Sequence, residues 1–239
     1  MVNENKQRTI LCYGDSNTWG FIPKSTNYET TIIERYPINV RWPGLLQILM
    51  GNRYYIIEEG LNGRTTNLDY HLQPDRNGKT YLPACLYSHA PIDLVLILLG
   101  ANDLKSYFNR SAKDICHGIS DLIDCIQSTT YGPNLKKAPK ILILSQPIPL
   151  PICEAFTDEN GSLIFKDAIR RAKLMVSLYS KLSREKGCFF LDVSSEVRPT
   201  DIDGMHLDES GHKKLAFLVK KAIDDIFLSE PRFQEINNL

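Results

Sequence analysis

The sequence predicts an α/β fold, a three-layer α/β/α sandwich around a five-stranded parallel sheet. Short apolar runs alternate along its 239 residues with longer segments in which apolar residues recur at helical spacing. Gly, Pro or polar residues bound each run, as is usual for buried strands of a parallel sheet. The chain contains no repeat, low-complexity tract or linker, so we expect a single domain over residues 1–239.

Five apolar runs are the expected strands. The third of them, DLVLILLG, is nearly uninterrupted, which is typical of a strand covered on both faces. In chain order the expected strands cover residues 9–13, 54–58, 93–99, 140–145 and 188–192.

Three apolar stripes predict helices that face the core. Ser111 and Asp114 can form a capping box at the start of the first helix, and Gly187 can end the second. The stripes consist of Ile115, Ile119, Leu122, Ile123 and Ile126; of Phe165, Ala168, Ala172, Met175, Tyr179 and Leu182; and of Leu215, Leu218, Ala222 and Ile226.

Composition limits the partners and the compartment. The 28 basic residues equal the 28 acidic ones, so no net field favours nucleic acid or an anionic membrane. The polar first residues, 1–8, precede an apolar run too short for a signal peptide or a membrane span. The six cysteines form no CxxC pair, and we expect them to be reduced. Together these features favour a cytoplasmic protein without nucleic-acid or membrane partners.

The chemistry of an open parallel sheet lies at the carboxyl ends of its strands. After the first expected strand comes GDSNTWG, which delivers Ser16 to this edge where a helix can begin. The Ser16 backbone N–H and the helix amino terminus can then face negative charge on a bound acyl group. A Gly-Asp-Ser turn by itself, however, is far more often structural than catalytic.

Two further segments at the same edge offer hydrogen-bond donors. Gly63, in EEGLNGRTT after the second strand, lets a backbone N–H approach a substrate closely. Asn102, in GAND after the third strand, offers a side-chain amide. With Ser16 they can supply three donors to one oxyanion. Taken singly, each motif is more simply a glycine turn or a helix cap.

The segment DGMH, before the last helix, supplies a general base and its partner. Asp203 stands three residues ahead of His206 and can fold back onto the imidazole Nδ1, which fixes the tautomer that a serine nucleophile requires. The remaining histidines lack this arrangement. We interpret His71, His89 and His117 as surface or packing residues, and His212 as part of a solvated helix face.

In this order, GDSN, the Gly63 turn, GAND and DGMH resemble the four blocks of the SGNH/GDSL hydrolases. The segments EEGLNGRTTN and YLPACLYSHAPIDLVLILLGANDLKSYF resemble the arylesterase and acyltransferase (perhydrolase) branch. The resemblance implies a flavodoxin-like SGNH fold and a homo-oligomer. It also implies site roles: Ser16 as nucleophile, His206 as general base, Asp203 as its orienter, and Ser16, Gly63 and Asn102 as the oxyanion hole.

Two positions depart from the family pattern and one adds to it. Asn17 replaces the Leu of GDSL, which questions the packing beneath the nucleophile. Ala101 stands where this branch often has a hydroxyl residue, so acceptor preference can differ. Trp19 lies three residues after Ser16, one turn away on a helix that begins at the nucleophile. It can wall the acyl or acceptor pocket, or it can pack in the core.

Rival chemistries find little support. Neither the G-x-S-x-G elbow nor a glycine-rich phosphate-binding motif follows an expected strand. The only pointers to a metal are the pair Asp201 and Asp203 and scattered histidines. We therefore expect no metal and no cofactor.

The sequence thus predicts a serine-dependent carboxylic-ester hydrolase that acts through an acyl-enzyme on a small-molecule ester, with acyl transfer as a second activity. The alternatives are a carbohydrate O-deacetylase and a non-catalytic ligand-binding module. Acyl and alcohol preference depend on the loops over residues 21–40 and 147–161, which carry no recognisable code.

Overall fold

A computed structural model describes residues 7–23, 34–71 and 73–228 of the chain. Their strands are β1 (Arg8–Gly14), β2 (Tyr54–Gly60), β3 (Leu94–Leu98), β4 (Lys140–Leu144) and β5 (Phe189–Leu191). They form one sheet in the order β2-β1-β3-β4-β5, and every neighbouring pair is parallel. The predicted five-stranded parallel sheet is confirmed, with strand ends that differ from expectation by one or two residues.

The register of the central strands aligns the motifs. Gly14, the last residue of β1, is paired with Gly60 of β2 on one side and with Leu98 of β3 on the other. The chain therefore leaves all three strands at the same level, and the segments that follow them meet at one edge of the sheet.

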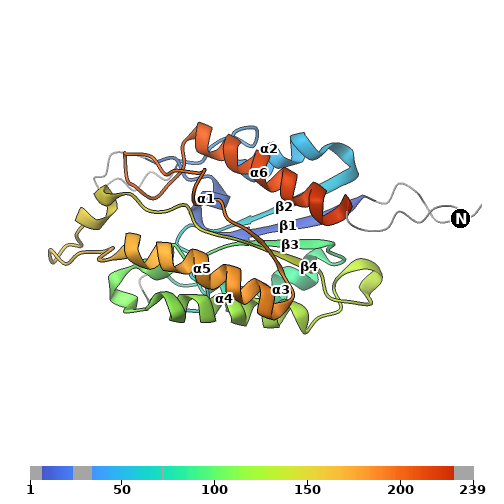
Figure 1. Cartoon of the computed structure of the whole chain (residues 1–239), viewed down its shortest axis with the longest axis horizontal. Helices are drawn as coiled ribbons and strands as arrows, with labels where there is room; N and C mark the ends of the chain where they lie inside the picture. The colour runs from blue at the N-terminus through green and yellow to red at the C-terminus, as the bar shows by residue number, and fades with distance from the viewer. Residues whose placement is uncertain (1–6, 24–33, 72, 229–239) are drawn as a thin grey trace, which may run out of the picture.

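Helices cover both faces of the sheet, which gives the predicted three layers (Figure 1). One face carries α2 (Trp42–Met50) and α6 (Glu209–Leu228), packed on the buried residues of one core cluster. The other face carries α3 (Gly78–His89), α4 (Ala112–Gln127) and α5 (Ala168–Lys186), packed on a second cluster. A single turn, α1 (Ser16–Trp19), follows β1, and short 3₁₀ turns cover Gly51–Arg53, Asn102–Leu104, Ser106–Phe108, Pro133–Leu135 and Pro151–Ala155.

The predicted helix signals are largely confirmed. Ser111 and Asp114 form the expected capping box at the start of α4, and Gly187 ends α5 in the left-handed conformation with φ 66°. Phe165 is buried but precedes α5. The predicted stripe of α6 was partly wrong, since Leu218 and Ala222 lie only at the edge of the buried face. The buried residues of α6 are Gly211, His212, Leu215, Ala216, Val219, Ile223, Ile226 and Phe227.

Sequence reasoning did not identify α2 and α3. Both contain a proline, Pro43 in the first turn of α2 and Pro83 inside α3. The core-facing residues of α2 do recur at helical spacing (Trp42, Leu45, Leu46, Leu49 and Met50), but sequence reasoning did not use this signal. Proline at the start of a helix is harmless because that N–H has no partner within the helix. Packing against the sheet stabilises these helices where local preference does not.

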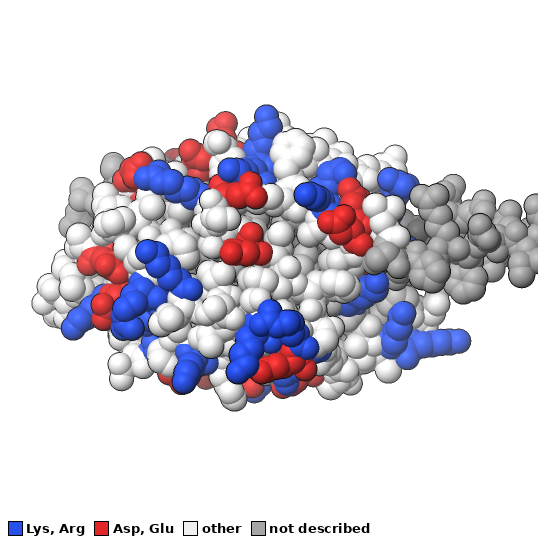
Figure 2. Space-filling view, viewed as in Figure 1, with Lys and Arg blue, Asp and Glu red and all other residues white. Residues whose placement is uncertain are grey.

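Basic and acidic side chains intermingle on the face shown in Figure 2, without a large area of one sign. This distribution agrees with the neutral formal charge of the chain. In the part of the chain that the structure describes, no helix has both the length and the apolar character needed to cross a membrane.

Candidate active site

Ser16 occupies the first position of α1, immediately after β1. Asp15 caps this turn, since its Oδ1 accepts a hydrogen bond from the Asn17 N–H at 3.0 Å. Gly14 has to be glycine, because a Cβ there would lie 2.0 Å from Thr18 Oγ1. The short GDS sequence thus forms a tight strand-to-helix turn that holds the serine hydroxyl at the edge of the sheet.

Ser16, His206 and Asp203 form a continuous hydrogen-bonded chain. His206 Nε2 lies 2.8 Å from Ser16 Oγ, and His206 Nδ1 lies 2.6 Å from Asp203 Oδ2. The second oxygen of Asp203 accepts the backbone N–H groups of Met205 and His206, each at 2.9 Å. The three residues that the sequence singled out, 190 positions apart at the extremes, therefore lie together.

The environment of Asp203 keeps this carboxyl ionised. Burial raises its pKa, but the hydrogen bond and charge of His206 and the two backbone N–H groups outweigh that effect, and the pKa lies below its usual range. The His206 side chain is 21% exposed. An ionised partner on Nδ1 leaves Nε2 to accept a proton from the serine hydroxyl.

The expected oxyanion donors lie on neighbouring loops. Gly63 has a φ of 79°, and a Cβ there would lie 2.5 Å from Gln73 Oε1, so only glycine fits this turn. Asn102 donates one amide N–H to the Arg64 carbonyl at 3.1 Å. This bond fixes the orientation of the amide, and its second N–H remains for a substrate oxygen.

Asp103 ties the Asn102 segment to the strand-β2 loop. Its buried carboxylate accepts hydrogen bonds from the Thr66 N–H at 3.0 Å and the Thr66 hydroxyl at 2.6 Å, and it pairs with Arg110 at 2.7 Å. The two loops that carry Gly63 and Asn102 are therefore held to each other as well as to the sheet.

Asn17, the departure from GDSL, has a definite role in the structure. Its amide donates to the Met205 carbonyl at 3.2 Å and accepts the Leu207 N–H at 3.1 Å. These two bonds bracket His206 and clamp its loop to α1. Sequence reasoning predicted only that packing beneath the nucleophile could change, because a clamp to a segment so distant in sequence cannot be identified from the motif alone.

Phe21 is a second residue that sequence reasoning missed. Its ring centroid lies 4.5 Å from that of His206 at an interplanar angle of 37°, so it covers one face of the imidazole. The only available signal was its place at the start of the loop over residues 21–40. Residues 24–33 of that loop lie outside the described residues.

Trp19 and Ala101 were predicted to contact substrate. Trp19 is partly buried at the end of α1, outside both core clusters, with the Arg35 guanidinium 5.0 Å from its ring centroid. The alternative that Trp19 packs in the hydrophobic core is therefore wrong. Ala101 is partly buried at the start of the 3₁₀ turn that carries Asn102.

The prediction for His212 was wrong. It is fully buried rather than solvated, its Nδ1 accepts the Trp42 N–H at 3.3 Å, and its ring packs edge-on against Tyr36. Burial lowers its pKa to about 4, so it is neutral at pH 7. The pair Asp201 and Asp203, weighed above as a metal signal, is divided between two partners: Asp201 pairs with Arg198, and Asp203 faces His206.

Comparison with known proteins identifies the family of the chain. Residues 12–214 match the family described as "GDSL-like Lipase/Acylhydrolase family". An aryl esterase of M. smegmatis is 36% identical, with a TM-score of 0.82 over 91% of this chain and 99% of that one. A carbohydrate acetylesterase from Sinorhizobium meliloti is 35% identical, with a TM-score of 0.83 over 92% of this chain and 100% of that one.

A third relative is longer. An acetylxylan esterase of Xylanibacter ruminicola is 26% identical over 226 residues, which are 90% of this chain but only 42% of that enzyme. The match to the family model covers most of the chain, from the end of β1 into α6. The predicted SGNH-type carboxylic-ester hydrolase is confirmed, and the chain belongs to the GDSL-like lipase/acylhydrolase family.

Proposed function

We propose that this chain cleaves its ester through an acyl-enzyme on Ser16, with His206 as general base, Asp203 as its orienter, and the Ser16 and Gly63 N–H groups and the Asn102 amide as oxyanion donors. The observation that carries the proposal is the hydrogen-bonded chain from Asp203 through His206 to Ser16, with separations of 2.6 and 2.8 Å. Such a chain is what a serine nucleophile needs.

The reaction proceeds in two halves. Ser16 Oγ attacks the carbonyl carbon while its proton passes to His206 Nε2, and the negative charge moves to the carbonyl oxygen that faces the three donors. Collapse of this intermediate breaks the bond to the alcohol, which leaves with the proton from His206. Water then attacks the acyl-enzyme and gives a proton to His206 Nε2. Collapse of the second intermediate breaks the bond to Ser16 Oγ, which takes that proton back from His206, and the acid is released.

Covalent labelling separates this enzyme from the alternative, a non-catalytic binding module. We expect a fluorophosphonate to add to Ser16, as seen by peptide mass spectrometry, and Ser16→Ala to prevent the adduct. Ser145 is the matched serine that should stay unlabelled, because its hydroxyl is buried and donates to Asp192 at 2.8 Å. A protein that folds but takes no label would favour the binding module.

We propose that the acyl group is small, with acetyl as the first candidate. The support comes from the relatives, two of which are named for acetyl esters and one for aryl esters. An aryl acetate and a fully acetylated xylo-oligosaccharide test the alcohol side. Preference for the sugar ester by kcat/KM would identify a carbohydrate O-deacetylase, the second candidate function.

Acyl transfer is the proposed second activity, with alcohol or peroxide in place of water. The support is the position of Trp19 three residues after Ser16 on α1, because an indole that lined the acceptor site would make that site less hydrated. With vinyl acetate and a primary alcohol in water we expect measurable transfer ester, and Trp19→Ala should change the ratio of ester to acetate. Acetate alone across all alcohol concentrations would leave only hydrolysis.

The proposed substrate is a small-molecule ester. We also propose a compartment and an assembly state for the chain. We place the chain in the cytoplasm, because its six cysteines are free and free thiols persist where the compartment is reducing. The family resemblance supports a homo-oligomer. Cell fractionation tests the first point, and size-exclusion chromatography with light scattering tests the second.

A further inference from the structure

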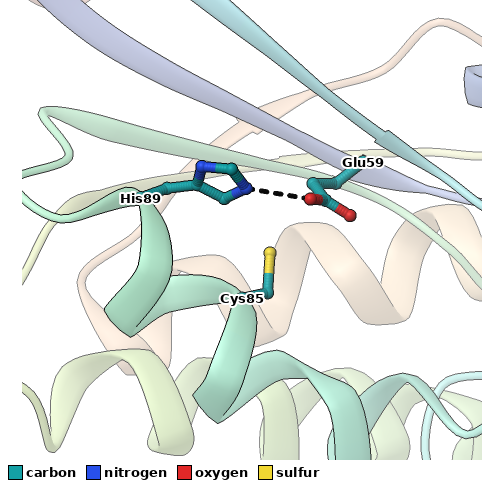
Figure 3. Close-up of side chains that lie close together, drawn as sticks. All are labelled: Glu59, Cys85 and His89. Atoms are coloured by element: carbon teal, nitrogen blue, oxygen red, sulfur yellow. Dashed lines mark hydrogen bonds and ion pairs between the residues drawn. The ribbon is translucent and has the colours of Figure 1, made fainter.

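A cluster of three metal-ligating side chains lies between the sheet and α3, and it shares no residue with the proposed triad. Glu59 comes from β2, while Cys85 and His89 lie one helical turn apart on the same face of α3. One ligand atom from each side chain lies within 4.8 Å of the others. Figure 3 shows the three groups directed toward a common space.

We propose that Glu59, Cys85 and His89 bind one Zn²⁺ ion. An imidazole nitrogen, a thiolate sulfur and a carboxylate oxygen are the three donor types that zinc uses in proteins, and the thiolate disfavours Mg²⁺ and Ca²⁺. Three protein ligands leave a fourth tetrahedral position for water.

The distances suit a metal of this size after a small adjustment. Ligands about 2.0 to 2.3 Å from a tetrahedral zinc are themselves separated by roughly 3.3 to 3.8 Å. His89 Nε2 now lies 2.9 Å from Glu59 Oε1, slightly closer than this separation, and all three ligand atoms lie within 4.8 Å of one another. Zinc would replace the hydrogen bond between His89 and Glu59.

Access is open on one side of the cluster and closed on the other. The side chains of His89 and Glu59 are 30% and 18% exposed, whereas Cys85 is 1% exposed. An ion can therefore enter past the imidazole and carboxylate and meet the sulfur at the inner end. Tyr81 donates its hydroxyl to Glu59 at 3.4 Å, which gives the carboxylate a partner outside the ligand set.

The zinc ion and its three protein ligands would together carry no net charge. Burial and the negative charge of Glu59 raise the pKa of Cys85 to about 12, so the thiol keeps its proton until a cation displaces it. Zn²⁺ with a thiolate, a carboxylate and a neutral imidazole sums to zero. The nearby Arg64 cation favours the thiolate and opposes the metal; its guanidinium lies over the Tyr13 ring at 4.2 Å and donates to the Gly14 carbonyl at 2.9 Å.

Cobalt titration of the whole chain, kept reduced with a phosphine, tests the site directly. We expect one equivalent of Co²⁺ to produce a thiolate-to-cobalt charge-transfer band, which Zn²⁺ removes by competition and Mg²⁺ does not. Cys85→Ser should abolish the band. Cys125→Ser, at a partly buried cysteine on α4 outside the cluster, is the matched control and should keep it.

A second variant covers the case in which Cys85→Ser fails to fold. His89→Gln changes a partly exposed side chain, and we expect it to weaken zinc affinity by more than the roughly 10- to 100-fold that loss of a ligand's hydrogen-bond partner costs. His117→Gln, at an exposed histidine on α4, should bind like the wild type. Zinc should also raise the Tm of the wild type and of His117→Gln far more than that of His89→Gln.

Three results would overturn the proposal. They are cobalt spectra without a thiolate band, a band that survives in His89→Gln at full strength, and a wild-type Tm that zinc does not move. In each case the cluster is an ion pair with a neighbouring thiol and nothing more.

Discussion

Two histidines lie close together before and at the start of α6, yet their surroundings differ. His206 has a partner on each ring nitrogen, Asp203 on one side and Ser16 on the other, and remains partly exposed. His212 is fully buried; its Nδ1 accepts one backbone N–H, and its Nε2 has no partner among the described residues. We therefore expect His206 to exchange protons during the proposed reaction and His212 to remain neutral.

The groups around each imidazole determine whether it can take up a proton. A carboxylate on Nδ1 stabilises the imidazolium that forms during proton transfer, whereas an apolar enclosure disfavours it. We therefore expect changes at His206 to alter rates with little effect on stability, and changes at His212 to do the reverse.

The largest effect is expected at the nucleophile and base. Ser16→Ala and His206→Ala should each lower kcat for p-nitrophenyl acetate by about 10⁴-fold or more, because the triad acts as a unit. Their thermal unfolding should match that of the wild type. Near-normal turnover by either folded variant would remove these residues from the mechanism.

On the same side of the contrast, Asn102 is assigned an interaction that matters chiefly in the transition state. Asn102→Ala should lower kcat by about 10²- to 10³-fold with a smaller change in KM. Steady-state kinetics on the same ester measure both constants. A change confined to KM would point instead to ground-state binding of the substrate.

Asn17 tests how firmly the His206 loop must be held. Asn17→Leu restores the GDSL sequence but removes both bonds to the loop, and we expect kcat to fall about 10- to 100-fold because the imidazole loses its position. Asn17→Asp keeps the acceptor for Leu207 and should lose less. Equal activity in all three proteins would show that the clamp is dispensable.

His212 should affect stability instead. His212→Ala should lower the free energy of unfolding by about 2 to 4 kcal/mol, since it leaves a cavity and an unpaired Trp42 N–H, while kcat of the folded fraction stays unchanged. Urea denaturation with parallel kinetics separates the two effects. If neither the free energy of unfolding nor kcat changed, the interpretation of His212 as part of a solvated helix face would be supported instead.

The pH dependence at His212 has a definite sign. Its pKa is about 4 when folded and 6.5 in model peptides, so the unfolded state binds more protons between these values. The free energy of unfolding should therefore fall as the pH drops from 6.5 to 4, by up to about 3 kcal/mol more in the wild type than in His212→Gln. Parallel curves for the two proteins would contradict the assigned burial.

The smallest effect is expected from chelation. Each assigned catalytic role is filled by a side chain or a backbone N–H, so EDTA should leave kcat for p-nitrophenyl acetate unchanged, even if it strips zinc from Glu59, Cys85 and His89. A loss of activity that zinc restores would place a metal in the reaction and tie the two sites together.

The sequence by itself predicted the sheet, three of the helices and the loops at the carboxyl edge. These features depend on local pattern, because buried strands need apolar runs and helix ends need caps such as Ser111 and Gly187. It also predicted the pair Asp203 and His206, since that contact spans only three residues. The family resemblance connected this pair with Ser16.

Contacts between segments that are distant in sequence became known only from the tertiary structure. The clamp from Asn17 to the His206 loop, the ring of Phe21 against the imidazole and the burial of His212 beneath α2 all join segments that no local pattern connects. The same holds for Glu59, Cys85 and His89, which stand on a strand and a helix that the fold brings together. Hydrogen-bond partners and burial depend on packing in three dimensions, and it is these that set the role of a polar side chain.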